Sequence, residues 1–387
     1  MKILYITTIS DTVNSFLIPH IKQLISQGHE VGVAFQIVEE IHPKLKGLPC
    51  KIHEIPFQRT PFHRDNIEAI QEIRRLVENE QYQVVHVHTP VASFITRFAL
   101  RKNQNVKVIY TAHGFHFYKG APIINWLLYY PMERIASKWT DVLIIINEED
   151  FQHAQKFKLR QNQSLYLLNG VGINLQQFYP KSTLEKKQLR EKYGFSGEDF
   201  LLIYVAEISQ RKNQHFLIHI LHKLKEQIPT IKLLLAGDGK EIEKIKKLVS
   251  KYELEERVHF LGYRYDIPDL LAISDLAVST SKQEGLPVNV MEAMACGIPL
   301  VVSNCRGNRD LIYHDVNGYV VELGDVNGFA ERINHLYKNQ GLMKKFSTHN
   351  LKNIMHYSEQ NVLEKLNKIY LEQLIKGESI LMESNLG

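Results

Sequence analysis

Short runs of aliphatic and β-branched residues alternate with segments of helical periodicity along most of the chain. In the first half this pattern predicts helices near residues 15–27 and 66–80 and strands at residues 2–7, 30–35, 84–88, 106–113 and 141–146. Strands that alternate with helices indicate βαβ units, and strands of nearly continuous apolar character are typical of a parallel sheet buried on both faces. The first half is therefore expected to form a Rossmann-like α/β domain.

The alternation begins again in the second half, where strands are expected at residues 200–207, 231–239, 257–263, 275–280, 298–304 and 318–323. Between the halves, residues 168–180 contain turn formers and no clear period. The sequence thus predicts two α/β domains, residues 1–178 and 179–357. An amphipathic segment at residues 358–378 is expected to form a helix that returns to the first domain.

Composition agrees with a two-domain globular protein, because 387 residues with 44% hydrophobic content exceed what one ordinary core needs. The net charge is +5, but Lys and Arg alternate with Glu and Asp on the predicted helices, so no nucleic-acid-binding patch is expected. Cys50, Cys296 and Cys305 lack metal or CxxC spacing, which is typical of a reducing compartment. Since the chain opens with a strand pattern instead of a signal peptide, we expect a cytoplasmic protein.

For one segment, contact with a membrane is one of two alternatives. Residues 123–132 are strongly apolar and aromatic, although no apolar run approaches the roughly 18–20 residues that span a bilayer. Lys119, Arg134 and Lys138 flank the segment. An interfacial helix at the inner face of the cytoplasmic membrane and a helix buried in the first domain both fit this pattern.

Candidate chemistry lies in the loops after strands, since ligands of open parallel sheets bind beyond the carboxyl ends of the strands. Arg211 and Lys212 follow the strand at 200–207 and precede a helix. Two cations beside free helix N-terminal amides suit an anion such as a diphosphate, and a solvated basic turn would have the same sequence.

The ends of the next two strands carry less specific candidates for ligand binding. Gly237, Asp238 and Gly239 end the stretch at 231–239, where glycines permit either a close approach to a ligand or a tight turn. Arg264 follows the strand at 257–263, and both a nucleobase pocket and the protein surface are compatible with it.

Residues 282–304 combine a strand end, a turn and a helix start with two carboxylates. Glu284 and Glu292 lie eight positions apart. Between them stand three residues that form the expected turn: Gly285, Leu286 and Pro287. Pro287 suits the first turn of a helix that ends near Gly297, and the preceding amides would then face an anion. The carboxylates would accept hydrogen bonds from sugar and ribose hydroxyls.

Together, the stretches MKILYIT, TAHG, NGVGIN, QRKNQ and EGLPVNVMEAMACGIPLVVSN resemble the retaining glycosyltransferases of family four over nearly the whole chain. The segment from TAHGFHFYKG to PMER resembles more narrowly the bacterial transferases of capsule and exopolysaccharide assembly. This resemblance implies a GT-B fold of two facing Rossmann-like domains. It also implies transfer of a hexose or N-acetylhexosamine from a UDP-sugar to a saccharide acceptor linked to undecaprenyl diphosphate.

The resemblance assigns roles to several of these residues. It implies that Glu284 contacts the donor sugar, that Glu292 contacts the ribose, and that Lys212 with Arg211 binds the diphosphate of the donor. It places His113 near the donor sugar and the leaving group. The first domain would then bind the acceptor, and the second would bind the nucleotide sugar.

Residues on the acceptor side are expected after the strands of the first domain. His113 and Gly114 stand at the end of the strand at 106–113, and Asn14 and Ser15 stand where many relatives have a Gly-Gly pair. Because of this departure, the sequence does not settle which loop residues bind the acceptor.

Two other features of these loops bear on the charge at the site. His86 and His88 end the strand at 84–88, and their i, i+2 spacing without further ligands disfavours a metal site. They are expected to shape the acceptor side. Ala206-Glu207 replaces a Gly-Arg pair of the relatives, so Arg211 is expected to supply the missing charge.

No nucleophile is evident, so retention favours attack from the face that the diphosphate leaves, with catalysis by electrostatic stabilisation. The sequence contains no D-x-D triplet, and we expect neither a metal ion nor another cofactor. A dehydrogenase is disfavoured because no G-x-G-x-x-G follows the first strand. Two alternatives stay open: a nucleotide-sugar epimerase or hydrolase of GT-B fold, and a non-catalytic nucleotide-sugar-binding subunit of a polysaccharide assembly complex.

Overall fold

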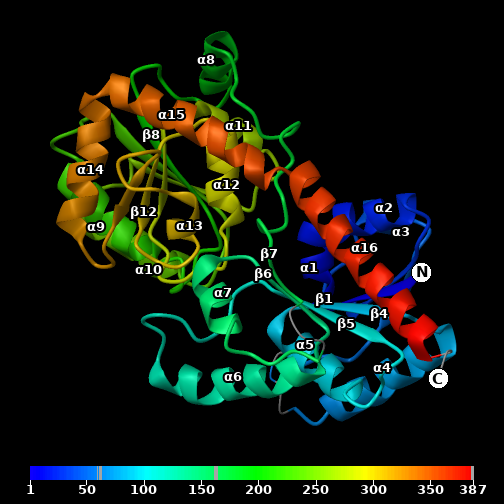
Figure 1. The fold of residues 1–387 in the computed structure, drawn as a ribbon. Coiled ribbons are helices and arrows are strands. Elements are labelled where there is room, and N and C mark those ends of the chain that lie inside the picture. The colour runs from blue at the N-terminus through cyan, green and yellow to red at the C-terminus, as the bar shows by residue number, and fades with distance from the viewer. Residues whose placement is uncertain (59, 61–62, 161–163, 385–387) are drawn as a thin grey trace. The chain divides into compact units, whose positions relative to one another are not determined.

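The computed structural model describes residues 1–58, 60, 63–160 and 164–384, with side chains described up to residue 372 in the last helix. The chain divides into two compact units, Met1–Val171 with Glu359–Gly387 (unit 1) and Gly172–Ser358 (unit 2). Each unit is built around one parallel sheet (Figure 1).

The sheet of unit 1 is doubly wound. Within its described residues the strands lie in the order Lys51–Glu54 (β3), Glu30–Gln36 (β2), Lys2–Ile9 (β1), Val84–His88 (β4), Lys107–Ala112 (β5), Val142–Ile145 (β6) and Leu165–Leu167 (β7). All neighbouring strands are parallel. The order reverses between β1 and β4, which makes the carboxyl ends of these strands the expected ligand-binding edge.

The helices of unit 1 follow from the same alternation. They are Ser10–Thr12 (α1), the π-helical turn Val13–Leu17, Ile18–Ser26 (α2), Pro43–Lys46 (α3), Asn66–Glu80 (α4), Pro90–Ala99 (α5), Ile123–Ala136 (α6), Glu148–Ala154 (α7) and Glu359–Ser384 (α16). Of the single helix predicted at 15–27, residues 15–17 belong to the π-helical turn and α2 begins only at Ile18.

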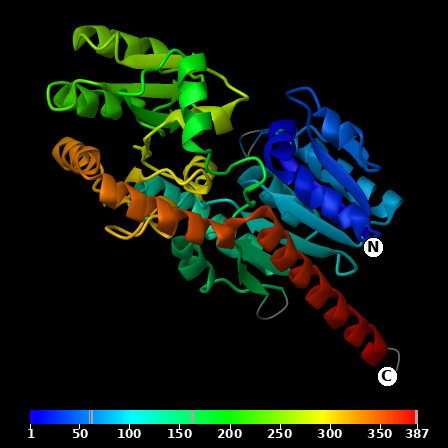
Figure 2. The same cartoon turned by 90° about the horizontal axis from the view of Figure 1, so that it is seen from above.

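The last helix, α16, belongs to unit 1. Figure 2 shows it in red as one continuous helix after the shorter α15. Its apolar stripe, which includes Val362, Leu366 and Ile369, packs with Ile3 and Tyr5 of β1 in one buried cluster. The predicted return of this helix to the first domain is confirmed.

Unit 2 repeats the doubly wound topology. Its strands lie in the order Val258–Gly262 (β10), Ile231–Ala236 (β9), Phe200–Val205 (β8), Leu276–Ser279 (β11), Leu300–Ser303 (β12) and Tyr319–Val321 (β13) among the described residues. The order reverses between β8 and β11. The predicted α/β class with two parallel sheets is therefore confirmed.

Helices cover the sheet of unit 2 and bury its strands. They are Thr183–Lys192 (α8), Gln214–Leu224 (α9), Ile242–Lys251 (α10), Ile267–Ile273 (α11), Val288–Ala295 (α12), Asn308–Leu311 (α13), Val326–Lys338 (α14) and Gln340–Ile354 (α15). Short 3₁₀ turns at Ser137–Trp139 and Met355–Tyr357 follow α6 and α15.

Candidate functional site

The topology of unit 2 joins two predicted site residues at the point where its strand order reverses. Lys212 lies in the loop after β8 and Glu284 in the loop after β11, and these strands are neighbours. Lys212 Nζ donates a hydrogen bond to Glu284 Oε1 at 2.6 Å. Arg211 Nη1 donates to Glu284 Oε2 at 3.3 Å. Residues far apart in sequence thus form one charged cluster at the carboxyl edge of the sheet, where doubly wound folds bind ligands.

Rigid neighbours hold the carboxylate of Glu284, which is buried. Ser281 Oγ donates to Glu284 Oε1 at 2.5 Å, and the Tyr204 hydroxyl lies 2.7 Å from Ser281 Oγ. The same hydroxyl donates to the backbone oxygen of Lys212 at 3.0 Å. Burial, and then the charge of Glu284, raises the pKa of Tyr204, so this phenol stays protonated. The hydrogen bonds fix the charged groups before a ligand arrives.

A third loop, after β12, packs against the turn that contains Glu284. Arg306 is buried and donates from Nε to the Glu284 backbone oxygen at 2.9 Å. Gly307 has a φ of +79°, and a Cβ atom there would lie 2.5 Å from the Gly285 carbonyl oxygen. Sequence reasoning missed Arg306, for which the only signal was a basic residue in a loop after a strand.

The turn and helix predicted after β11 form as expected. Pro287 is the N-cap of α12, Leu286 before it is buried, and Gly297 follows the C-cap residue. Glu292 lies in α12 and is partly buried, and no hydrogen-bond partner of its carboxyl group is found among the described residues. Burial raises the pKa of Glu292 to about 8, so this side chain is largely protonated at neutral pH.

The glycines after β9 serve the packing of two loops. A Cβ atom on Gly237 would lie 2.0 Å from the Ala206 carbonyl oxygen, and one on Gly239 would lie 2.1 Å from that of Ile208. The Ile208 amide donates to the Asp238 carbonyl oxygen at 2.8 Å. The close approach that these glycines permit is therefore made by the protein's own backbone.

Arg264, after β10, is engaged with its own loop. Its Nε donates to Asp266 Oδ1 at 2.8 Å, and the guanidinium lowers the pKa of Asp266 to about 2. The Tyr193 hydroxyl also donates to this carboxylate, at 2.5 Å. A role of Arg264 at a nucleobase stays a prediction.

In unit 1 the predicted histidine, His113, follows β5 and meets a histidine of the neighbouring strand β4. His113 Nε2 lies 3.0 Å from His88 Nδ1. The ring of His88 contacts that of His86 at 4.3 Å between centroids. His86 Nδ1 lies 2.6 Å from the Tyr370 hydroxyl of α16, which donates to Tyr5 at 3.1 Å. A chain of rings therefore joins the carboxyl edge of the sheet to the last helix.

Burial keeps these histidines neutral. It lowers the pKa of His113 to about 4, with a smaller contribution from His20, and it lowers the pKa of His86 and His88 well below the ordinary value. His86 and His88 are each only 1% exposed, so neither ring can contact an acceptor directly. That they shape the acceptor side stays a prediction, and any such role would pass through His113, which His88 contacts.

The loop that carries His113 and Gly114 is anchored by α7. The Phe115 amide donates to Asp150 Oδ2 at 2.9 Å, and Asn147 Nδ2 donates to the same oxygen at 2.9 Å. Burial and these bonds leave the loop few alternative positions.

Sequence reasoning also missed Thr89, at the end of β4. This β-branched residue has a φ of +64°, an unusual and strained conformation of the kind found at functional sites. Its Oγ1 accepts a hydrogen bond from the Thr8 amide at 3.0 Å, which ties the ends of β4 and β1 together at the reversal point.

Asn14 and Ser15 lie in the π-helical turn after β1. Asn14 Nδ2 donates to the Glu40 carbonyl oxygen at 3.0 Å, and Asn14 Oδ1 accepts from the His42 amide at 3.0 Å. Asn14 thus joins the loops after β1 and β2, whereas Ser15 is exposed. Within the described residues, no group of three or more His, Cys, Asp and Glu side chains could hold a metal ion.

Two family profiles match the chain, one in each half. The profile described as Glycosyl transferase 4-like matches residues 2–147, and that described as Glycosyl transferases group 1 matches residues 185–352. The chain is similar to the putative glycosyltransferase EpsD of Bacillus subtilis, with 38% identity over 371 residues that span 95% of this chain and 96% of EpsD. The chain belongs to the group 1 glycosyltransferases of family four.

Two other likenesses extend this assignment. The UDP-Gal:alpha-D-GlcNAc-diphosphoundecaprenol alpha-1,3-galactosyltransferase of Escherichia coli is 28% identical over 272 residues, 69% of this chain and 70% of that enzyme. The structure of Anabaena HepE in complex with UDP and glucose has a TM-score of 0.79 at 19% identity and covers 96% of this chain and 100% of HepE. The predicted GT-B fold and glycosyltransferase class are confirmed.

Proposed function

We propose that this glycosyltransferase moves a hexose or N-acetylhexosamine from a UDP-sugar to a lipid-linked saccharide, with retention, in the synthesis of bacterial cell-surface polysaccharide on the cytoplasmic side of the membrane. The observation that carries the proposal is the cluster of Arg211, Lys212 and Glu284 at the reversal point of unit 2. The name of the Escherichia coli relative, which specifies a UDP-galactose donor and a diphosphoundecaprenol-linked acceptor, supports it.

In this proposal unit 2 is the donor domain. Arg211 and Lys212 bring two positive charges to the single carboxylate of Glu284, so the cluster has one charge in excess for a diphosphate. The amides of Gly285 and Leu286 before α12 would add to that charge. Donors fixed in this way stabilise the negative charge that grows on the leaving diphosphate.

The two carboxyl groups would bind hydroxyls. Glu284 accepts a hydrogen bond from a hydroxyl of the donor sugar, and Glu292 binds the ribose. Because burial raises the pKa of Glu292 to about 8, its protonated carboxyl group can both donate and accept there. We place Gly237, Asp238, Gly239 and Arg264 on the donor side as well.

Unit 1 is the proposed acceptor domain, with Asn14, Ser15, His113 and Gly114 on the acceptor side. His113 is neutral, so it would act by hydrogen bonding near the donor sugar. In the transfer, the acceptor oxygen forms a bond to the anomeric carbon as the bond to the UDP oxygen breaks. The acceptor proton goes to the departing diphosphate. No step in this scheme uses a metal ion or another cofactor.

The test is nucleotide release from a panel of UDP- and GDP-sugars, with and without acceptors of the undecaprenyl-diphosphate-sugar type. We expect one UDP-sugar to be consumed only when one acceptor is present, and turnover to persist in chelator. Acceptor-independent release of UDP would support the epimerase or hydrolase alternative. Binding of UDP-sugar without any turnover across the panel would support the non-catalytic subunit.

A further inference from the structure

The helix α6 is apolar on two faces, and unit 1 covers only one of them. Its inner side carries aromatic residues, of which Trp126, Tyr129 and Tyr130 pack against the buried cluster under the sheet. The one acidic residue of the helix, Glu133, also points inward and pairs with the buried Arg97 at 2.9 Å. The core of unit 1 therefore accounts for this side of α6.

The outer side of α6 is aliphatic and exposed. Ile123, Ile124, Leu127 and Ile135 are 78%, 61%, 67% and 50% exposed. Pro131, exposed as well, continues the same side between Leu127 and Ile135. A helix that is apolar all round normally lies in a core or in lipid, since water favours a polar outer face. Exposed apolar groups gathered on one helix side, in contrast to scattered single ones, mark an interaction site.

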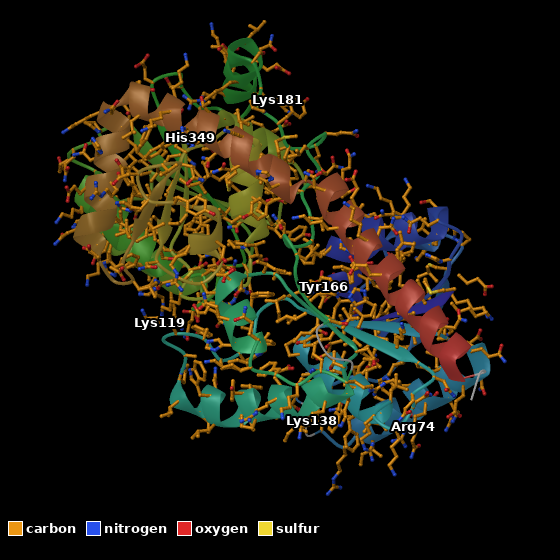
Figure 3. The ribbon with its side chains drawn as sticks, viewed as in Figure 1. Arg74, Lys119, Lys138, Tyr166, Lys181 and His349 are labelled. Carbon is orange, nitrogen blue, oxygen red and sulfur yellow. The ribbon has the colours of Figure 1, made fainter. Side chains whose placement is uncertain are left out.

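Three cations lie near the ends of this side. Lys119 lies in the loop before α6, and Lys138 follows its end (Figure 3). Arg134, in the last turn, is exposed beside Ile135. Glu149 of α7 accepts a hydrogen bond from the Lys119 backbone amide at 2.5 Å, so one carboxylate lies beside the first of these cations. An apolar strip with cations at its borders matches the interior and the phosphate layer of an anionic bilayer surface.

We infer that the outer side of α6, formed by Ile123, Ile124, Leu127, Pro131 and Ile135 with Lys119, Arg134 and Lys138, docks unit 1 on the surface of an anionic phospholipid bilayer. No helix among the described residues is long and apolar enough to cross a membrane. The helix instead lies in the interface, with its aliphatic side chains among the acyl chains and its cations at the phosphates.

This docking extends the proposed function and rests on it for its purpose, because a lipid-linked acceptor must be reached at the membrane. The chain from His113 to the start of α6 is short, and Asn125 of α6 donates to the His116 carbonyl oxygen at 2.9 Å. The docked helix is thus attached directly to the loop that carries His113. A lipid-linked saccharide in the same leaflet would meet this edge of the sheet.

The test is sedimentation of the full chain with vesicles of phosphatidylglycerol and phosphatidylethanolamine, and separately with neutral phosphatidylcholine vesicles. Burial of Leu and Ile side chains among acyl chains stabilises binding, so the double substitution I124E and L127E should weaken binding at least about tenfold. The control is L184E on α8, since Leu184 is 65% exposed, close to the 67% of Leu127. It should leave vesicle binding unchanged.

Charge is tested by reversal of the cations. Each cation near an anionic surface contributes about fivefold to binding, so K119E, R134E and K138E together should abolish the preference for phosphatidylglycerol vesicles. The affinity for UDP, measured by calorimetry, should be unchanged by any of these substitutions, since they all lie on the exposed side of the helix or beside it. Vesicle binding without UDP binding would sustain the docking and reject the proposed function, and UDP binding without vesicle binding would do the reverse.

Two results would overturn the inference. One is equal sedimentation of the double variant I124E and L127E and the unchanged protein with anionic vesicles. The other is absence of vesicle binding together with a dimer, measured by light scattering, that L127E dissociates. The second result would show that the outer side of α6 meets a second copy of the chain.

Discussion

Lys212 Nζ lies 2.6 Å from Glu284 Oε1, and this contact joins the loops after the two strands at which the order of the unit 2 sheet reverses. Both side chains are largely buried, at 12% and 7% exposure. A buried carboxylate that loses its cation is strongly destabilised, so the pair supports the fold of the turn as well as the proposed binding of a diphosphate. Single substitutions therefore mix two effects, which a double substitution separates.

The substitution K212M should lower the turnover number about a hundredfold or more, because it removes a fixed donor to the leaving diphosphate. It should also lower the free energy of unfolding by about 2 kcal/mol, since Arg211 alone then faces the carboxylate of Glu284. The measurements are steady-state release of UDP and thermal unfolding of the same preparation.

The double variant K212M and E284Q serves as the control for this effect. It removes both charges, so most of the lost stability should return while turnover stays low. Recovery of turnover together with stability would mean that Lys212 acts only as a structural partner of Glu284.

His88 is predicted to set the tautomer of His113. In H88L the 3.0 Å contact to His113 Nε2 is lost, and a partly buried ring nitrogen is left without that partner. We expect the turnover number to fall about tenfold with little change in the KM for the donor, because the hydrogen bond orients His113 and does not bind nucleotide. Nitrogen chemical shifts of His113 should show a mixture of tautomers in place of one.

The matched variant is H88N, in which an amide can replace the ring nitrogen that faces His113. It should recover most of the turnover and restore a single His113 tautomer. If both variants lose turnover equally while the His113 spectrum stays unchanged, His88 serves packing alone.

Much of the fold follows from the period of the hydrophobic pattern. The helix predicted at residues 66–80 has those bounds in α4, since an amphipathic segment with polar flanks leaves little choice. The short edge strands β3, Lys51–Glu54, and β7, Leu165–Leu167, were not predicted. Both are partly exposed and only three or four residues long, which is too short to show a clear period.

The site was predictable to the extent that it lies in loops after strands. Lys212 and Glu284 were both proposed from the sequence, but their contact depends on the adjacency of β8 and β11, which the linear pattern does not contain. Arg306 was missed for the same reason. It donates a hydrogen bond to the Glu284 carbonyl oxygen in a loop that follows another strand, and the two loops meet only through the order of strands in the sheet. The burial of His88 depends likewise on helices that cover both faces of the sheet.

Glu292 should make unit 2 less stable as the pH rises. Its folded pKa, about 8, lies above its ordinary value of 4.5, so protons are held more tightly by the folded state. Stability is therefore full below about pH 4.5 and falls as the pH rises to about 8. E292Q, which cannot ionise, should gain on the order of 2 kcal/mol relative to the unchanged protein between pH 5 and pH 8, after allowance for partial exposure.

The readout is the difference in melting temperature between E292Q and the unchanged protein across that pH range. The control is E331Q, since Glu331 is an exposed residue of α14 and its substitution should give a constant difference. A constant difference for E292Q as well would place the Glu292 carboxyl in contact with water.

Gly307 is predicted to be required for stability and activity. A side chain there would meet a neighbouring backbone atom, and the φ of Gly307 is positive. Gly307 and Gly324 have φ values of +79° and +88°, but only at Gly307 does an added Cβ atom meet another atom, the Gly285 carbonyl oxygen at 2.5 Å. G324A should therefore cost about 1 kcal/mol of stability, from backbone strain alone.

G307A should cost more stability than G324A and should push the turn at Gly285 away from Lys212 and Arg211. We expect its kcat/KM for the donor to fall at least about tenfold, whereas G324A keeps full activity, because preorganised charge loses its effect when the turn moves. Equal losses of stability and activity in the two variants would show that the approach of the loop after β12 to Gly285 does not position the site.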